Sequence, residues 1–227
     1  MTQSPWWYRQ RAAVFGALYG IGFFAGGLYA ALTNTPYQPA AAQLGSWGAP
    51  LALALMAGAV AVRVWGSSYL RVSTVWNADS SSDRLLICGP FRYTRNPLYF
   101  GNVLMAIAFG LLAPPVGLAV IIITNFAFIS ALIAWEERGM RARYGAAFDQ
   151  YCRAVPRLFP RVLPREQAGH VAPVLTDGLR AEVFTGSLLA GMLALVLSPH
   201  YGWPIFAAFY IVGIVAQIAV ARRCAGA

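Results

Sequence analysis

Long apolar runs alternate with short polar segments along the chain, and they predict membrane-spanning helices. The six apolar stretches cover roughly residues 12–32, 49–65, 98–113, 116–135, 183–199 and 203–221. A helix needs about 20 apolar residues to cross the hydrocarbon core of a bilayer, so the short third stretch is expected to lie partly in the interface. The pattern therefore predicts an all-α fold, a polytopic membrane helix bundle with about six transmembrane helices.

The third and fourth stretches form one uncharged block. Forty residues from Asn96 to Trp135 carry no charged side chain, and Pro114-Pro115 interrupts them at the middle. The diproline predicts a tight reversal that returns the chain to the membrane face it left. Arg95 and the pair Glu136-Glu137 are therefore expected to lie close together on one face, where they suggest a site.

Two polar segments carry apolar residues at helical spacing and predict amphipathic helices at the membrane surface. The first stripe is Tyr69, Val72, Val75 and Trp76, and the second is Met140, Tyr144, Phe148, Tyr151 and Val155, closed by Pro156 and Pro160. Within the first span, Gly16-xxx-Gly20 and Gly22-xxx-Gly26 predict close helix packing. Arg63, near the end of the second span, is expected to extend towards the interface.

Composition and charge add a location to this picture. The chain is 59% hydrophobic and 11% charged, whereas soluble domains average about 25% charged residues. All 17 basic residues are arginine, and the segments 33–48, 113–116 and 199–203 contain no Arg, Asp or Glu. The positive-inside rule then predicts that both termini, both large loops and the amphipathic helices are cytoplasmic. We expect an integral protein of a bacterial inner membrane.

The net charge, the cysteines and the histidines indicate which binding partners to expect. The net charge of +9 is explained by topology and by attraction to anionic lipid, so the membrane is the expected partner and nucleic acid is not. Cys88, Cys152 and Cys224 fall on the predicted cytoplasmic side and are expected to be reduced. The tail Cys224-Ala-Gly-Ala has the outline of a prenylation signal, but its middle residues are poor for one. His170 and His200 are isolated, so no metal site is expected.

Two polar features at the ends of the uncharged block are candidates for chemistry. Asn96-Pro97 is typical of a helix start, with Asn at the N-cap and Pro at the first helical position. A helix start exposes backbone N–H groups that suit an anion, although capping alone also explains the pair. Glu136-Glu137 ends an apolar span, where two carboxylates need cations. They either pair with neighbouring arginines or hold a cationic ligand.

These features occur together in a pattern that resembles a known family. The run Gly89-Pro-Phe-Arg-Tyr-Thr-Arg-Asn-Pro-Leu-Tyr-Phe-Gly101, the apolar hairpin, Glu136-Glu137 and the segment from Tyr144 to Arg157 resemble the isoprenylcysteine carboxyl methyltransferase and phospholipid methyltransferase superfamily. The resemblance covers about residues 60–160. It implies an integral-membrane enzyme that uses S-adenosylmethionine at the cytoplasmic side and receives a lipid substrate from the bilayer.

The resemblance also implies site residues, position by position. The cofactor shell would include Leu85, Leu86, Phe91, Asn96, Pro97, Leu98, Tyr99 and Glu136. Catalytic roles are expected for Glu136, Glu137, Arg95 and Tyr99. The acidic pair and the rings of Phe91 and Tyr99 can stabilise a cationic cofactor, and the helix start with Arg95 suits the cofactor's carboxylate. The second Glu is the expected general base if the acceptor is an ammonium group.

Two departures from the prenylcysteine branch bear on the methyl acceptor. Asn96 stands where the prenylcysteine branch commonly has histidine. The pattern Asn-Pro-x-Tyr also occurs in the phospholipid branch. Leu132 stands where prenylcysteine enzymes carry the arginine that is thought to meet the substrate carboxylate. The sequence therefore favours an aminophospholipid-type amine. The alternatives are a prenylcysteine-type carboxyl methyltransferase, an NADPH-dependent membrane sterol reductase, and a non-catalytic scaffold or small transporter.

The expected organisation has three parts. Residues 1–66 form a two-helix membrane packing unit, residues 67–164 the methyltransferase core, and residues 165–227 a linker with two further membrane helices. The sequence does not indicate what the last two helices contribute, or whether the protein forms oligomers.

Overall fold

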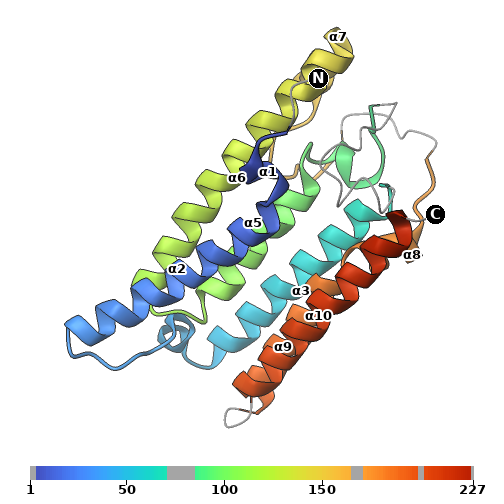
Figure 1. Cartoon of the computed structure of the whole chain (residues 1–227). Helices are drawn as coiled ribbons and strands as arrows, with labels where there is room; N and C mark the ends of the chain where they lie inside the picture. Colours follow the sequence, from blue (N-terminus) through green and yellow to red (C-terminus); the bar gives the residue numbers. More distant parts are fainter. Residues whose placement is uncertain (1–3, 71–84, 165–170, 199–201, 226–227) are drawn as a thin grey trace. The chain divides into compact units, whose positions relative to one another are not determined.

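The fold is helical throughout the part of the chain that the computed structural model describes, which is residues 4–70, 85–164, 171–198 and 202–225 (Figure 1). The elements are α1 (Trp6–Arg9), α2 (Arg11–Leu32), η1 (Ala40–Trp47), α3 (Gly48–Ser67), η2 (Gly89–Arg92), α5 (Pro97–Gly110), α6 (Pro115–Tyr144), α7 (Ala146–Ala154), α8 (Leu175–Ala181), α9 (Val183–Leu197) and α10 (Gly202–Ala225). The predicted all-α polytopic class is confirmed.

Helix length and composition support fewer spans than the six expected. Within the described residues, four helical segments are long and apolar enough to cross a membrane: Arg11–Leu32, Ala40–Ser67, Pro115–Tyr144 and Pro204–Arg223. A fifth results if α8 and α9, which meet at a bend of 66°, count as one span. Helix α5 has 14 residues, so at about 1.5 Å per residue it is shorter than the ~30 Å hydrocarbon core.

The chain groups into two compact units whose boundaries fall inside helices. Unit 1 comprises Met1–Ala59 and Asn102–Glu136, and unit 2 comprises Val60–Gly101 and Glu137–Ala227. The predicted division at residues 66 and 164 stays a prediction.

Unit 1 is held together by close packing of α2 on the α5–α6 hairpin. A methyl group added at Gly22 would overlap the side chain of Ile121, and one at Gly26 would lie 2.8 Å from Cδ of Pro114. The second predicted glycine pair therefore packs as expected. Gly16 and Gly20 have no atom of the described residues within 4 Å of an added Cβ, so the first pair does not pack against another helix within the described part of this chain.

The reversal predicted at the diproline is confirmed. Helix α5 ends at Gly110 and α6 begins at Pro115, where proline's fixed φ and missing N–H suit the first helical position. The segment after α2 is tied to this turn, because the backbone N–H groups of Ala40 and Ala41 donate to the carbonyls of Ala113 and Leu111 at 2.7 and 2.9 Å.

Helix α6 continues beyond the uncharged block, which corrects the predicted second amphipathic helix. Its 30 residues run through Glu136 and Glu137 to Tyr144. The helix ends because Gly145 adopts φ 52°, a conformation that glycine tolerates, and α7 follows. The apolar stripe is nevertheless used: Phe148, Tyr151 and Val155 form a buried cluster against which Met140, Tyr144 and Leu85 pack.

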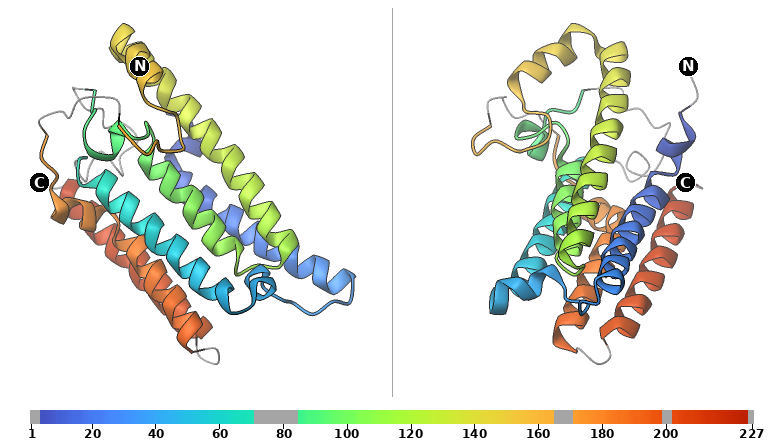
Figure 2. Two further views of the ribbon diagram at one scale, coloured as in Figure 1. Left: turned by 180° about the vertical axis from the view of Figure 1, so that it is seen from behind. Right: turned by 90° about the vertical axis from the view of Figure 1, so that its left-hand side faces the viewer.

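In unit 2, α9 and α10 lie side by side in an antiparallel hairpin (Figures 1 and 2). Small residues permit the close approach: a methyl group at Gly191 would lie 2.7 Å from Cδ2 of Phe206. The expectation for Arg63 is wrong. Its side chain is 12% exposed and pairs with the fully buried carboxylate of Glu182, because a charge inside an apolar bundle is stabilised by a countercharge.

Three expectations fall on residues outside the described ranges: the first amphipathic stripe beyond Leu70, and His170 and His200. The side chain of Cys224 also lies outside the description. Cys88 and Cys152 form no disulfide among the described residues.

Gly22 and Gly20 offer a matched test of the packing in unit 1. We expect Gly22→Ala to destabilise the protein by about 1–3 kcal/mol, because its methyl group overpacks against Ile121. Gly20→Ala should leave stability unchanged or slightly higher, since alanine is the better helix former. Thermal unfolding of both variants in detergent measures the difference, and equal effects would contradict the packing described for α2.

Candidate active site

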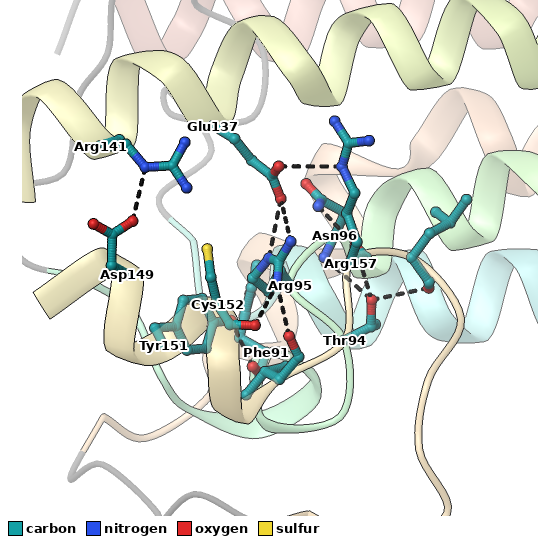
Figure 3. A network of polar contacts seen from close by, with 12 residues as sticks. Phe91, Thr94, Arg95, Asn96, Glu137, Arg141, Asp149, Tyr151, Cys152 and Arg157 are labelled. Carbon is teal, nitrogen blue, oxygen red and sulfur yellow. Dashed lines mark hydrogen bonds and ion pairs between the residues drawn. The ribbon is translucent and has the colours of Figure 1, made fainter. Parts of the chain in front are cut away.

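Two segments distant in sequence, residues 91–96 and 151–161, are joined side by side in unit 2 (Figure 3). The hydroxyl of Tyr151 donates to the carbonyl of Phe91 at 2.6 Å. The backbone N–H of Arg95 donates to the carbonyl of Pro156 at 2.9 Å, and that of Arg161 to Tyr93 at 3.0 Å. These bonds satisfy backbone groups that no regular helix or strand pairs, so the two segments form one ordered structure.

The local sequence explains how the first segment turns. Gly89 has φ 51°, which glycine adopts without steric cost. A Cβ at this position would also overlap the ring of Tyr69. Pro90 then starts the short helix η2 and is almost fully buried.

Arg95 is the centre of the polar network. Its Nη1 donates to the carbonyls of Cys152 and Val155 at 2.9 and 2.8 Å. Its Nε and Nη2 lie 3.0 and 2.9 Å from Oε1 of Glu137. The side chain is 11% exposed, so the guanidinium is held at several points with little competition from water.

Glu137 lies between two arginines. Besides Arg95, the Nε of Arg157 donates to Oε2 of Glu137 at 3.1 Å. The expected proximity of Arg95 to the acidic pair is therefore confirmed for Glu137. Because one carboxylate meets two guanidinium groups, the cluster keeps a surplus of positive charge.

The predicted helix start at Asn96-Pro97 is also present beside this cluster. Helix α5 begins at Pro97, and the N–H of Phe100 donates to the carbonyl of Asn96 at 3.0 Å. The side-chain Nδ2 of Asn96 donates to the carbonyl of Arg157 at 2.8 Å, so this amide also joins the two segments. Thr94 does the same through its hydroxyl, which donates to Leu158 at 2.9 Å.

The other residues expected around a cofactor are distributed over unit 2. Leu85 packs on the cluster of Phe148, Tyr151 and Val155, and Pro97 is almost fully buried. The remaining four are half-buried: Leu86, Phe91, Leu98 and Tyr99.

Glu136, the other predicted carboxylate, belongs to unit 1 and has different surroundings. The hydroxyl of Tyr8 donates to its Oε1 at 2.8 Å. The centroids of the Tyr8 and Trp135 rings lie 3.9 Å apart. The guanidinium of Arg11 lies 4.8 Å from the centroid of the Tyr8 ring. Successive helical residues point about 100° apart, so Glu136 and Glu137 face different groups although they are adjacent.

The thiol of Cys152 lies beside the Arg95 network. Burial raises the pKa of the Cys152 thiol, and the positive charge of Arg95 opposes part of that rise. The thiolate is the nucleophilic form of cysteine, so a raised pKa makes this residue a poor nucleophile at neutral pH.

Sequence reasoning missed several of these contacts. Arg157 was part of the motif, but nothing in the pattern identified it as a second partner of Glu137. Tyr151 was recognised only as an apolar position. Tyr8 carried no signal, because its partner Glu136 lies 128 positions away.

The arrangement has definite chemical capacities. In unit 2, a helix start and a surplus of guanidinium charge favour an anionic group such as a carboxylate. In unit 1, the carboxylate of Glu136, oriented by Tyr8, favours a cation.

Comparisons with known proteins agree with the resemblance. Residues 44–147 match the family described as phospholipid methyltransferase, which belongs to the isoprenylcysteine and phospholipid methyltransferase superfamily. The matched segment is a little under half of the chain and contains the whole run from Gly89 to Gly101 and the acidic pair.

Two curated bacterial proteins are similar to about half of the chain. The nickel-cobalt-cadmium resistance protein NccN of Alcaligenes xylosoxydans xylosoxydans is 28% identical over 112 residues, 48% of this chain and 53% of the relative. The cobalt-zinc-cadmium resistance protein CzcN of Cupriavidus metallidurans is 28% identical over 123 residues, 52% of this chain and 53% of the relative. The chain thus spans about half the length of these relatives. No solved structure matches it.

The ion-pair network allows a stability test. We expect Glu137→Gln to destabilise the protein by about 2 kcal/mol, because Arg95 loses its charged partner in a largely buried position. Asp149→Asn is the matched control: it breaks the pair with Arg141 at 2.7 Å, in which both side chains are exposed, and should change little. Denaturation of the two variants in the same detergent gives the comparison, and a larger loss for Asp149→Asn would refute the role given to Glu137.

Proposed function

We propose, from the match of residues 44–147 to the phospholipid methyltransferase family, that this protein transfers the methyl group of S-adenosylmethionine to a membrane lipid. The observation that carries the proposal is the Arg95–Glu137–Arg157 cluster beside the start of α5. The cluster adjoins the residues that the family resemblance assigns to the cofactor.

The residues of unit 2 fit the anionic end of the cofactor. The surplus positive charge around Glu137 and the positive end of the α5 helix dipole both favour a carboxylate. Asn96 and Arg95 are fixed by bonds to the segment 151–161. The anion site would therefore be ordered before the cofactor binds, which lowers the entropic cost of binding.

The acidic pair is given two different roles. Both oxygens of Glu137 accept from arginines, so we assign this residue to positioning Arg95. Glu136 is assigned to the cationic centre of the cofactor, as the family resemblance implies. Of the two carboxylates, Glu136 is also the one we propose for accepting a proton, because both oxygens of Glu137 already accept from arginines.

Because the methyl group of a sulfonium is already activated, the main task of the enzyme is to align the cofactor with the acceptor. S-adenosylmethionine, when bound, supplies a sulfonium methyl group that a lone pair on the acceptor can attack in line. The chain's residues hold the cofactor's two charged ends, exclude water and remove a proton from an ammonium acceptor. Such positioning is worth up to roughly 7–11 kcal/mol in favourable cases.

An amine is the acceptor we propose. Leu132 stands where prenylcysteine enzymes carry an arginine, and it is fully buried in α6. Because a leucine side chain is uncharged, this position offers no countercharge to a substrate carboxylate. An aminophospholipid of the surrounding bilayer has an amine at the membrane surface. A prenylcysteine carboxylate remains the alternative.

The setting we propose is a bacterial inner membrane with the site on the cytoplasmic face. The arginine distribution supports this orientation, and the similar proteins are bacterial. Their names concern resistance to nickel, cobalt, zinc and cadmium. From them we take only the bacterial setting.

Methyl transfer can be measured directly. Purified protein in lipid nanodiscs is incubated with S-adenosylmethionine labelled in its methyl group, with phosphatidylethanolamine or a prenylcysteine as acceptor. We expect label in the aminophospholipid and its loss in Glu136→Gln. Label in a prenylcysteine ester would overturn the proposed acceptor. Stabilisation by NADPH but not by S-adenosylhomocysteine would instead favour a reductase.

Tyr8 provides a test of the role of Glu136. Tyr8→Phe keeps the ring on Trp135 and removes the hydroxyl that orients the carboxylate. We expect the affinity for S-adenosylmethionine to fall by about tenfold, the effect of one hydrogen bond to a charged group. Tyr37→Phe, at a tyrosine that is 47% exposed, is the control. Calorimetric titration compares them, and unchanged binding in Tyr8→Phe would separate Tyr8 from the site.

A further inference from the structure

A buried carboxylate at the junction of α8 and α9 is absent from the function proposed so far. Glu182 lies at the 66° bend between these helices, and its side chain is 0% exposed. Arg63 of α3 binds it with two nitrogens: Nε lies 2.7 Å from Oε2 and Nη2 lies 3.1 Å from Oε1.

Each oxygen of Glu182 also accepts from a hydroxyl. Ser67 donates to Oε1 and Thr185 to Oε2, both at 2.8 Å. A buried carboxylate with a bidentate arginine and further donors is stabilised against desolvation, whereas the loss of one partner leaves an uncompensated charge. The pair therefore holds the end of α3 against the bend of α8–α9.

Arg63 also contacts the segment that begins α5. Its Nη1 donates to the carbonyl of Leu98 at 3.3 Å. The helices meet closely there, because a Cβ on Gly66 would lie 2.6 Å from Cδ1 of Leu98 and 3.5 Å from Cγ of Pro97. The same guanidinium thus binds Glu182 on one side and the first turn of α5 on the other.

Helix α8 also packs directly on the end of α3. A Cβ on Gly178 would lie 2.5 Å from the carbonyl oxygen of Val64, and the N–H of Val174 donates to the carbonyl of Ser68 at 2.7 Å. Backbone atoms form these contacts, so α8 can dock here only with a residue as small as glycine at position 178.

We propose that Glu182, through Arg63, positions the first turn of α5 for cofactor binding, so that the C-terminal helices are part of the methyltransferase site. The proposal rests on the proposed function, because Pro97 and Leu98 are assigned to the cofactor there. Glu182 and Arg63 are positioning residues and need not touch the cofactor.

A double substitution separates this role from general stability. Glu182→Met leaves Arg63 buried without its countercharge and is expected to unfold readily. Arg63→Met with Glu182→Met removes both charges at similar volume and should restore the melting temperature. Ser67 and Thr185 can then donate to carbonyls of their own helices. The double variant still lacks the donor to Leu98.

Two measurements follow on the folded double variant. Amide hydrogen exchange of residues 98–104 reports the order of the first turn without any cofactor, and we expect exchange there to be about tenfold faster than in the wild type. The Michaelis constant for S-adenosylmethionine should rise about tenfold while kcat at saturation changes less than twofold, the signature of lost binding. Asp177→Asn, on the exposed side of α8, is the control and should change neither.

Arg63→Lys is the second variant, in case the double variant does not fold. It keeps a charge for Glu182 but has one nitrogen instead of the fork that also contacts Leu98. Faster exchange of residues 98–104 in either variant supports the proposal. The proposal is overturned if a folded variant shows the same amide exchange and the same Michaelis constant for S-adenosylmethionine as the wild type. A wild type that neither binds S-adenosylmethionine nor labels lipid refutes the proposed function instead, and the exchange result distinguishes the two failures.

Discussion

A carboxylate in an apolar helical bundle needs a cation, and this requirement determines how unit 2 is organised. Glu137 is held by Arg95 and Arg157, and Glu182 is held by Arg63. Each pair joins segments that are distant in sequence, so the ion pairs act as cross-links. The first fixes residues 91–96 against 151–161, and the second fixes α3 against the bend of α8–α9.

Both cross-links act on the same short segment. The Arg95 network lies immediately before α5, and the Arg63 pair reaches the carbonyl of Leu98 in its first turn. The start of α5 is thereby restrained from two directions. A preorganised helix start with a surplus of guanidinium charge is a suitable receptor for a carboxylate. Glu136, the residue before Glu137, accepts a hydrogen bond from Tyr8 of unit 1 instead, since neighbouring helical positions point in different directions.

Much of the fold was predictable because it depends on local pattern. Apolar runs marked the long helices, Pro114-Pro115 marked the hairpin, and Asn96-Pro97 marked the start of α5. The predictions failed where a local pattern had two possible outcomes. Gly16 and Gly20 have the same spacing as Gly22 and Gly26, but among the described residues the latter pair packs on Ile121 and Pro114 and the former has no neighbour within 4 Å. The residues of the second amphipathic stripe do pack together, as predicted. They lie on two helices rather than one, because Gly145 separates α6 from α7.

The sequence by itself determined that this is an all-α membrane protein, which family its central segment matches, and that Arg95 and Glu137 lie close together. Hydrophobic periodicity, proline placement and a dense motif carry that information locally. Only the tertiary structure decided which arginine neutralises which carboxylate, and it assigned Arg63 to Glu182 and Arg157 to Glu137. Seventeen arginines of identical chemistry leave that choice open until packing brings particular side chains within hydrogen-bonding distance, and pairs up to 119 positions apart leave no periodic trace in the chain.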